Sequence, residues 1–224
     1  KDGMRPGFYG YEAGLCCVGD HFAWAAENVT RADYIEEANR RGISVLKLLI
    51  EKAAEQKPGE HGLVALNWFN GNRNILVDAA LSGMIVGMTL RTRPEDILRA
   101  LIEATAYGTR TIIENYRTHG VKVGRIVAAG GIARKDPFTM QTYADILNMD
   151  IEISGSAQAP ALSGAIQAAA AAGESDGGYA TLSEAMNHMV SACDKVYHPI
   201  PENVAVYDRL FAEYMKLHDY FGRG

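Results

Sequence analysis

Two adjacent glycines, Gly130 and Gly131, stand where an apolar segment ends and a helical one begins. In open α/β sheets, ligands gather at the end of a strand, and paired glycines let the backbone approach a flat or anionic group closely. The first N–H groups of a following helix are unpaired donors for an anion. The pair is therefore a candidate ligand site, although a purely structural turn would use the same residues.

The better-known phosphate and metal motifs do not occur in the chain. It contains no GxxxxGK[ST], and the glycine pair lacks the third glycine of a dinucleotide fingerprint. Six histidines and three cysteines show no metal-ligand spacing, so no metal site is predicted. The odd set of Cys16, Cys17 and Cys193 indicates free, buried thiols in a reducing compartment, and we expect a cytoplasmic protein.

The elements that would position the glycine pair alternate between strands and helices. Three helices are predicted first, at 15–28, at 31–41 and from the cap Ser44 onward. Apolar runs then predict strands at 63–66, 83–90, 125–129 and 150–154. Further helices are expected at 94–112, 136–148, 160–173 and 201–220, with one more after the cap Thr181. This order predicts one α/β domain with parallel strand pairs.

Composition excludes several classes of function. The net charge of −5 provides no basic stripe for nucleic acid. No apolar run approaches the roughly 18 residues that a membrane-spanning helix needs. The chain opens at Lys1 without a methionine, and we expect it to be a piece of a longer protein.

Several segments, in the same order along the chain, resemble the FGGY family of carbohydrate kinases. The stretch 130–147 resembles the family's adenosine-site segment, and 160–169 resembles its later helix rich in glycine and alanine. The stretches 83–90 and 94–106 match as well. Three further segments, 6–14, 67–73 and 218–224, resemble the family members that act on L-ribulose. The resemblance therefore covers essentially the whole chain.

The resemblance implies an α/β fold similar to actin and hexokinase. In that fold, two ribonuclease-H-like lobes close around Mg-ATP and a sugar. Residues 1–224 would form most of the second lobe, the C-terminal kinase domain, with added helices. The N-terminal lobe and the first strands of this lobe would lie outside the chain. The remaining sheet would then have an open edge, through which two copies could pair as a homodimer.

The resemblance also implies roles for individual residues. Adenine and ribose of ATP would lie against Gly131 and Lys135, with Gly130 in the same turn and Gly19 nearby. Glu12 would bind the sugar, since a carboxylate can accept hydrogen bonds from two adjacent hydroxyls. Taken without the resemblance, Glu12 is better explained as an exposed loop acid. Mg²⁺ would accompany the ATP.

Some positions depart from the family pattern. Many relatives have a glutamine at Ala23, and those acting on L-ribulose usually have Gln-Ser-Ala where this chain has Leu15-Cys16-Cys17. The polar contacts that relatives make there are not expected here. Arg73, in a polar loop between two predicted strands, is a candidate partner for a phosphate or else a solvated surface residue.

Phosphoryl transfer needs a charge clamp, Mg²⁺ and usually a base that takes the hydroxyl proton. The family's Asp-x-Gly-Thr loop, catalytic aspartate and Gly-Thr-Ser-Thr loop do not occur in this sequence, so we predict no catalytic residue in it and an inactive isolated chain. The intact kinase would transfer the γ-phosphate of ATP to L-ribulose and so serve arabinose catabolism. The alternatives are a kinase for another pentulose or a polyol, and a non-catalytic actin-like module that binds a nucleotide or a partner.

Overall fold

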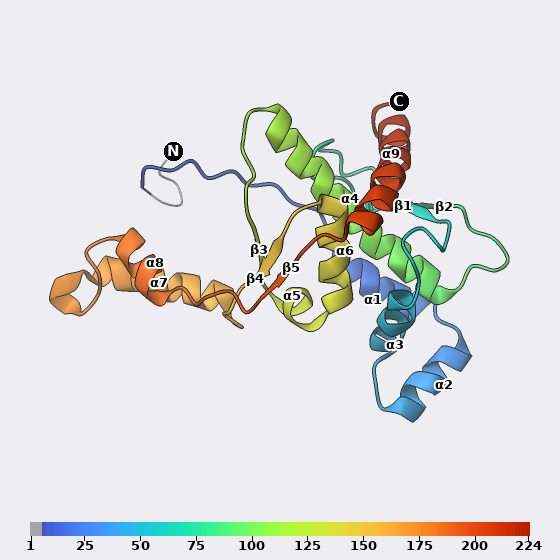
Figure 1. Cartoon of the computed structure of the whole chain (residues 1–224), viewed down its shortest axis with the longest axis horizontal. Helices are drawn as coiled ribbons and strands as arrows, with labels where there is room; N and C mark the ends of the chain where they lie inside the picture. Colours follow the sequence, from blue (N-terminus) through green and yellow to red (C-terminus); the bar gives the residue numbers. More distant parts are fainter. Residues whose placement is uncertain (1–5) are drawn as a thin grey trace.

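The computed structural model describes residues 6–224, in which a long central helix is surrounded by shorter helices and two small sheets (Figure 1). The central helix is α4 (Pro94–Thr118), with 25 residues. Pro94 occupies its first turn, and the Asp96 carboxylate accepts a hydrogen bond from the Arg93 backbone N–H at 2.7 Å. Most of α4 is buried, because other elements pack against it from several sides.

Three short helices precede the first sheet and end or begin at residues suited to caps. They are α1 (Gly19–Asn28), α2 (Ala32–Arg41) and α3 (Val45–Ala54). Gly42 ends α2 in a left-handed conformation, and the Ser44 hydroxyl caps α3 by accepting from the Lys47 N–H. Both boundaries agree with the sequence patterns. α1 and α3 pack against the first half of α4 in one apolar cluster.

The first helix begins later than predicted. The apolar spacing suggested a start at Leu15, whereas α1 begins at Gly19. Leu15 lies instead against Gly108 of α4, where an added Cβ would come within 2.9 Å of the leucine Cδ2. Long-range packing of this side chain therefore overrides the helical spacing, because the chain around it must stay irregular to reach α4.

The strands form two separate sheets. β1 (Val64–Leu66) pairs antiparallel with β2 (Met84–Val86). In the second sheet, of order β3-β4-β5, β3 (Ile126–Ala128) is parallel to β4 (Ile151–Ile153), and β5 (Lys195–Tyr197) is antiparallel to β4. The prediction of parallel pairs, made for strands that alternate with helices, is correct for β3 and β4. β1 and β2 follow each other without a helix between them and are antiparallel, because a parallel pair needs such a crossover.

Strand β5 has no counterpart among the sequence predictions. It has three residues, of which Tyr197 alone is buried. A run so short lacks the period that identifies a strand, and its pairing with β4 is a tertiary contact. The helix that precedes β4 is α6 (Pro137–Leu147), and it begins and ends as the sequence indicated, at the cap Asp136 and at the left-handed Asn148.

The last third of the chain has two parts. α7 (Ala159–Ala172), a short 3₁₀ turn (Glu174–Asp176) and α8 (Leu182–Met189) form an arm that projects from the rest of the structure (Figure 1). The final helix, α9 (Pro201–Arg223), returns to pack on α4, α6 and β1. Its inner face has the predicted residues Val204, Tyr207, Phe211 and Tyr214, and rings of this face surround Tyr107 of α4 at centroid distances of 5.3 to 6.4 Å.

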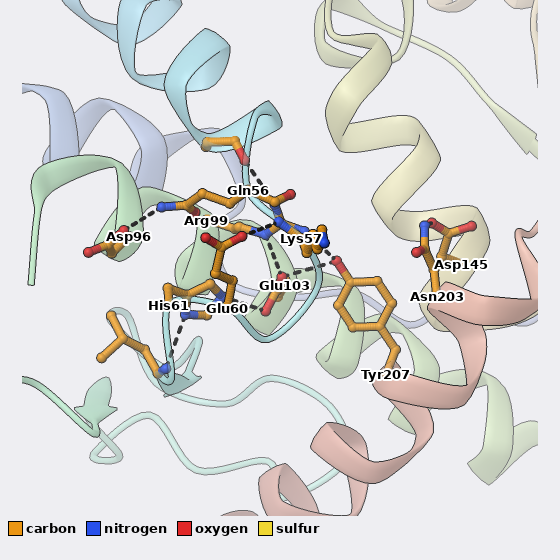
Figure 2. A network of polar contacts seen from close by, with 12 residues as sticks. Gln56, Lys57, Glu60, His61, Asp96, Arg99, Glu103, Asp145, Asn203 and Tyr207 are labelled. Carbon is orange, nitrogen blue, oxygen red and sulfur yellow. Dashed lines mark hydrogen bonds and ion pairs between the residues drawn. The ribbon is translucent and has the colours of Figure 1, made fainter.

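A buried ionic network joins these elements (Figure 2). The Arg99 Nε donates to Glu103 Oε1 at 2.9 Å, and Tyr207 of α9 donates its hydroxyl hydrogen to the same oxygen at 3.0 Å. Arg99 also donates to the carbonyl oxygens of Ala53 and Gln56, where α3 ends. The network therefore fixes α3 and α9 on α4 at the same place.

His61 completes this network from the segment before β1. The Leu63 N–H donates to its Nδ1 at 3.0 Å, so the ring proton is on Nε2, which donates to Glu103 Oε2 at 3.1 Å. Burial opposes ionisation of Glu103, but the hydrogen bond from His61 and the charge of Arg99 outweigh it and hold the pKa of Glu103 below its ordinary value. The resulting stabilisation is complete above the unfolded pKa of a glutamate, about 4.3, and is lost as the pH falls through the lower folded value.

Replacing Glu103 by Gln should destabilise the fold strongly, since it leaves the buried Arg99 without a counter-charge. We expect a loss of roughly 3–5 kcal/mol in the free energy of unfolding, measured by urea denaturation of the chain at pH 7. The control is Glu114→Gln on the same helix. Glu114 also pairs with an arginine, but its side chain is 43% exposed, so its loss should be below about 1 kcal/mol. Equal losses in both variants would contradict this account of the network.

Candidate functional site

The glycine turn lies at the C-terminal end of β3 and is open. Gly130 has φ 99°, a conformation that favours glycine, and Gly131 begins the short helix α5 (Gly131–Lys135). Both residues are exposed, and a Cβ added to either would meet no atom within 4 Å. The backbone of the turn is therefore exposed and not covered by other side chains. The helix that follows is the five-residue α5, however, and the predicted helix at Asp136 begins only after it.

The turn sits at the edge where the parallel strands end. The Ser154 N–H, just after β4, donates to the Ala128 carbonyl at 2.9 Å, so β3 and β4 reach this edge together. Arg134 of α5 donates to the Ser154 carbonyl at 2.9 Å and to Asp194 Oδ2 at 2.8 Å. α5 is thereby tied to the end of β4 and to the segment before β5. Sequence reasoning missed Arg134 and Asp194, because only the tertiary fold brings them together.

Three of the predicted nucleotide residues lie on or beside α5. Lys135 is four residues after Gly131, about one helical turn, so both project from the same side of α5, and Lys135 is exposed. Gly19 begins α1, and a Cβ added to it would lie 3.6 Å from Ile132 Cδ1 of α5. The structure therefore brings Gly19 next to the turn, although the two are far apart in the chain. Ala23, one turn further along α1, is exposed as well.

Glu12 lies beside a different element, the loop between β1 and β2. Its Oε2 accepts a hydrogen bond from Arg73 Nη2 at 2.8 Å, and both side chains are exposed. Arg73 thus has a carboxylate partner within the chain, which the sequence did not indicate. Two other polar residues of this loop have structural roles: buried Asn67 accepts from the Tyr214 hydroxyl at 3.1 Å, and buried Asn72 forms a backbone bridge with Asp78.

The two adjacent cysteines have different surroundings. Cys17 is buried, and its Sγ lies 3.5 Å from His21 Nε2. The His21 Nδ1 lies 3.3 Å from the Val18 carbonyl, so Nδ1 carries the proton and Nε2 accepts from the thiol. Burial and then the charge of Asp20 raise the pKa of Cys17, so it remains a thiol and acts as a core residue. Cys16, expected from the sequence to be buried, is exposed and borders a hollow of about 270 Å³ shared with Asn72 and Arg73.

The described residues offer no metal centre. Within residues 6–224, no group of three or more His, Cys, Asp or Glu side chains converges on one point. A metal site built from three such side chains is therefore absent from this range. At the open turn, the space that Cβ atoms at Gly130 and Gly131 would occupy is clear of other atoms. In the same range, no helix is both long and apolar enough to cross a bilayer.

Sequence comparison relates the chain to sugar kinases. Residues 1–172 match the FGGY family of carbohydrate kinases, C-terminal domain. The chain is 57% identical to a ribulokinase of Bacillus licheniformis over 223 residues and 50% identical to a ribulokinase of Halalkalibacterium halodurans over 224 residues. Both alignments cover 100% of this chain and 40% of the relative. The chain therefore spans well under half the length of these curated relatives.

Solved structures of sugar kinases superpose on the chain. A ligand-bound xylulose kinase from Lactobacillus acidophilus matches with a TM-score of 0.73 and 26% identity, covering 92% of this chain and 39% of that one. A gluconate kinase from the same organism gives 0.72 and 26%, covering 91% and 38%. Plasmodium falciparum glycerol kinase with ADP, at 0.63 and 20% identity over 91% of this chain and 37% of its own, shares the fold.

These neighbours confirm the expected fold class, a partial lobe of the actin- and hexokinase-like type with added helices. The family match covers 172 of the 224 residues, including β3, the glycine turn, α5 and all of the arm helix α7. On these grounds, the chain belongs to the FGGY family of carbohydrate kinases and corresponds to its C-terminal domain.

Proposed function

We propose that this chain is the nucleotide-binding C-terminal domain of an ATP-dependent ribulokinase, which converts L-ribulose to L-ribulose 5-phosphate. The observation that supports this most directly is the open glycine turn at the end of β3, flanked by Gly19 and Lys135. The turn occurs in a chain that is 57% identical to a ribulokinase over 223 residues, which is 100% of this chain and 40% of the ribulokinase. A fold match alone would support only a kinase of unspecified substrate.

The glycine turn is proposed to receive the adenosine part of ATP. A flat ring needs a surface without side chains, and the turn provides one at Gly130 and Gly131. Lys135 lies on the same side of α5, where its ammonium group can donate to ribose or phosphate oxygens. Mg²⁺ bound with the ATP phosphates would neutralise their charge, and its protein ligands are proposed to lie outside this chain.

Glu12 is proposed to bind the sugar hydroxyls. Its side chain is 70% exposed, which leaves the carboxylate accessible to a ligand. We assign L-ribulose rather than xylulose or gluconate, because the ribulokinases are 50–57% identical to this chain whereas the xylulose and gluconate kinases compared above are 26% identical. The intact kinase is proposed to work in the cytoplasm, where ATP is available and exposed thiols such as Cys16 stay reduced.

A valine at Gly131 should prevent nucleotide binding without harming the fold. The residue does not have a positive φ, and its added side chain meets open space, so the obstruction acts on the ligand alone. We expect ATP affinity of the full-length kinase to fall at least about 100-fold, roughly 3 kcal/mol, by isothermal titration calorimetry. The matched control is Gly124→Val, another exposed glycine without positive φ or near neighbours. Unchanged ATP affinity in the Gly131 variant would refute the site assignment.

The full-length kinase should prefer L-ribulose over other polyols. With ATP and Mg²⁺, we expect kcat/KM for L-ribulose to exceed that for D-xylulose, glycerol and D-gluconate by at least about tenfold, since sites that hydrogen-bond particular hydroxyls discriminate strongly. The coupled assay that follows ADP release measures this directly. The isolated chain serves as the control and should show no turnover. A higher kcat/KM for D-xylulose would assign the protein to another member of the family.

The edge strand β3 is proposed to associate with a second copy when the chain is isolated. β3 is at one edge of its sheet, and Val127 on it is 48% exposed. We expect light scattering of the isolated chain to show dimers, and Val127→Lys to reduce them, because a charged side chain discourages edge pairing. A monomer at all concentrations would show that this edge does not pair.

A further inference from the structure

The ion pair between Arg73 and Glu12 joins two segments that are 61 residues apart in the chain. Arg73 belongs to the loop between β1 and β2, and Glu12 to the segment before α1. Their side chains are 56% and 70% exposed, so solvent screens the attraction and the pair adds little to folding stability. The ion pair contributes little to folding stability but holds Glu12, the proposed sugar-binding residue, which points to a role for Arg73 in sugar binding.

The loop that presents Arg73 is held firmly in place. Asn72 and Asp78 exchange two backbone hydrogen bonds of 2.8 and 2.9 Å, which close the loop directly beside Arg73. Gly71 has φ 80°, and an added Cβ would lie 2.7 Å from the Ala79 Cα, so the two sides of the loop are in close contact. Buried Asn72 also accepts from the Leu76 N–H at 3.1 Å. The backbone at Arg73 is therefore fixed in position by the loop.

The same loop holds the Glu12 segment at a second point. The Gly14 backbone N–H donates to Asn74 Oδ1 at 2.8 Å, so consecutive loop residues contact positions 12 and 14. Gly14 lies directly beside the ion pair: a Cβ there would be in ordinary van der Waals contact with it, 3.7 Å from Arg73 Nη1 and 3.9 Å from Glu12 Oε1. Backbone and carboxylate are thus both oriented by the loop.

The pairing leaves part of the carboxylate available. Arg73 binds Oε2, and within residues 6–224 the other oxygen, Oε1, forms no hydrogen bond. An ionised carboxylate has about four acceptor positions, so Oε1 can accept from neighbouring hydroxyls of a polyol while Oε2 stays with the arginine. Once a substrate covers the pair, the lower local dielectric strengthens its attraction.

We propose that Arg73 is a positioning residue for the sugar: it holds Glu12 so that Oε1 faces the substrate hydroxyls. This inference rests on the proposed role of Glu12 in sugar binding and adds the residue that orients it. A carboxylate on a freely rotating side chain would bind the sugar more weakly, because binding would have to order that side chain. In this proposal, Arg73 contacts Glu12 and does not contact ATP.

The test compares the KM values for L-ribulose and ATP in the full-length kinase. We expect Arg73→Ala to raise the KM for L-ribulose about tenfold while leaving the KM for ATP and the melting temperature unchanged. Arg73→Lys should recover part of the loss, since lysine supplies the charge and a donor but not the planar fork. The matched control is Arg31→Ala, which removes another exposed arginine paired with a carboxylate, here that of Asp33 on α2, and should change neither KM.

A double-mutant cycle separates this inference from the proposed function. If Arg73 acts through Glu12, Arg73→Ala should add nothing to the effect of Glu12→Ala. An undiminished effect in the Glu12→Ala background would show that Arg73 acts on the substrate directly and would overturn the positioning role. A raised KM for L-ribulose in Glu12→Ala but not in Arg73→Ala would overturn it as well. An unchanged KM in Glu12→Ala would instead refute sugar binding by Glu12, and the inference with it.

Discussion

The buried pair of Arg99 and Glu103 is the interaction on which the arrangement of this domain depends. Charges inside a protein are costly unless every hydrogen-bonding group is satisfied. Here the guanidinium needs the carbonyl oxygens at the end of α3 and the hydroxyl of Tyr207 on α9, and the carboxylate needs His61 before β1. None of these groups can move away without leaving a hydrogen-bonding position of the buried ion pair unsatisfied. The ion pair therefore determines where three distant segments meet α4, more than it contributes net stability.

The position of α4 in turn determines the candidate nucleotide site. α1 packs on one part of this helix and α6 on another, while α5 packs on α6. The approach of Gly19 to Ile132 follows, because α4 positions α1 directly and positions α5 through α6. Arg134 then secures α5 to the ends of β4 and β5. The glycine turn is thus exposed but firmly supported, which is the combination that a binding surface requires, since a ligand then does not have to order it.

The domain presents two separate groups of candidate binding residues on different supports. One is the glycine turn at the strand edge, and the other is Glu12, held by the loop between β1 and β2. In the proposed kinase, ATP would bind at the first group and the sugar at the second. Such a division agrees with a chain that spans 40% of its ribulokinase relatives.

The sequence by itself determined the features that depend on neighbouring residues. The ends of α2, α3 and α6 follow from Gly42, Ser44 and Asp136, and the glycine pair after β3 indicated an open turn, because caps and turns are local interactions. The family motifs, which are short stretches of sequence, indicated the fold class in the same way. Only the tertiary structure decided the antiparallel pairing of β1 with β2, the existence of β5, the approach of Gly19 to Ile132 and the pairing of Arg73 with Glu12. These contacts join residues tens of positions apart, and a single sequence carries no periodic or local signal for such partners until the core brings them together.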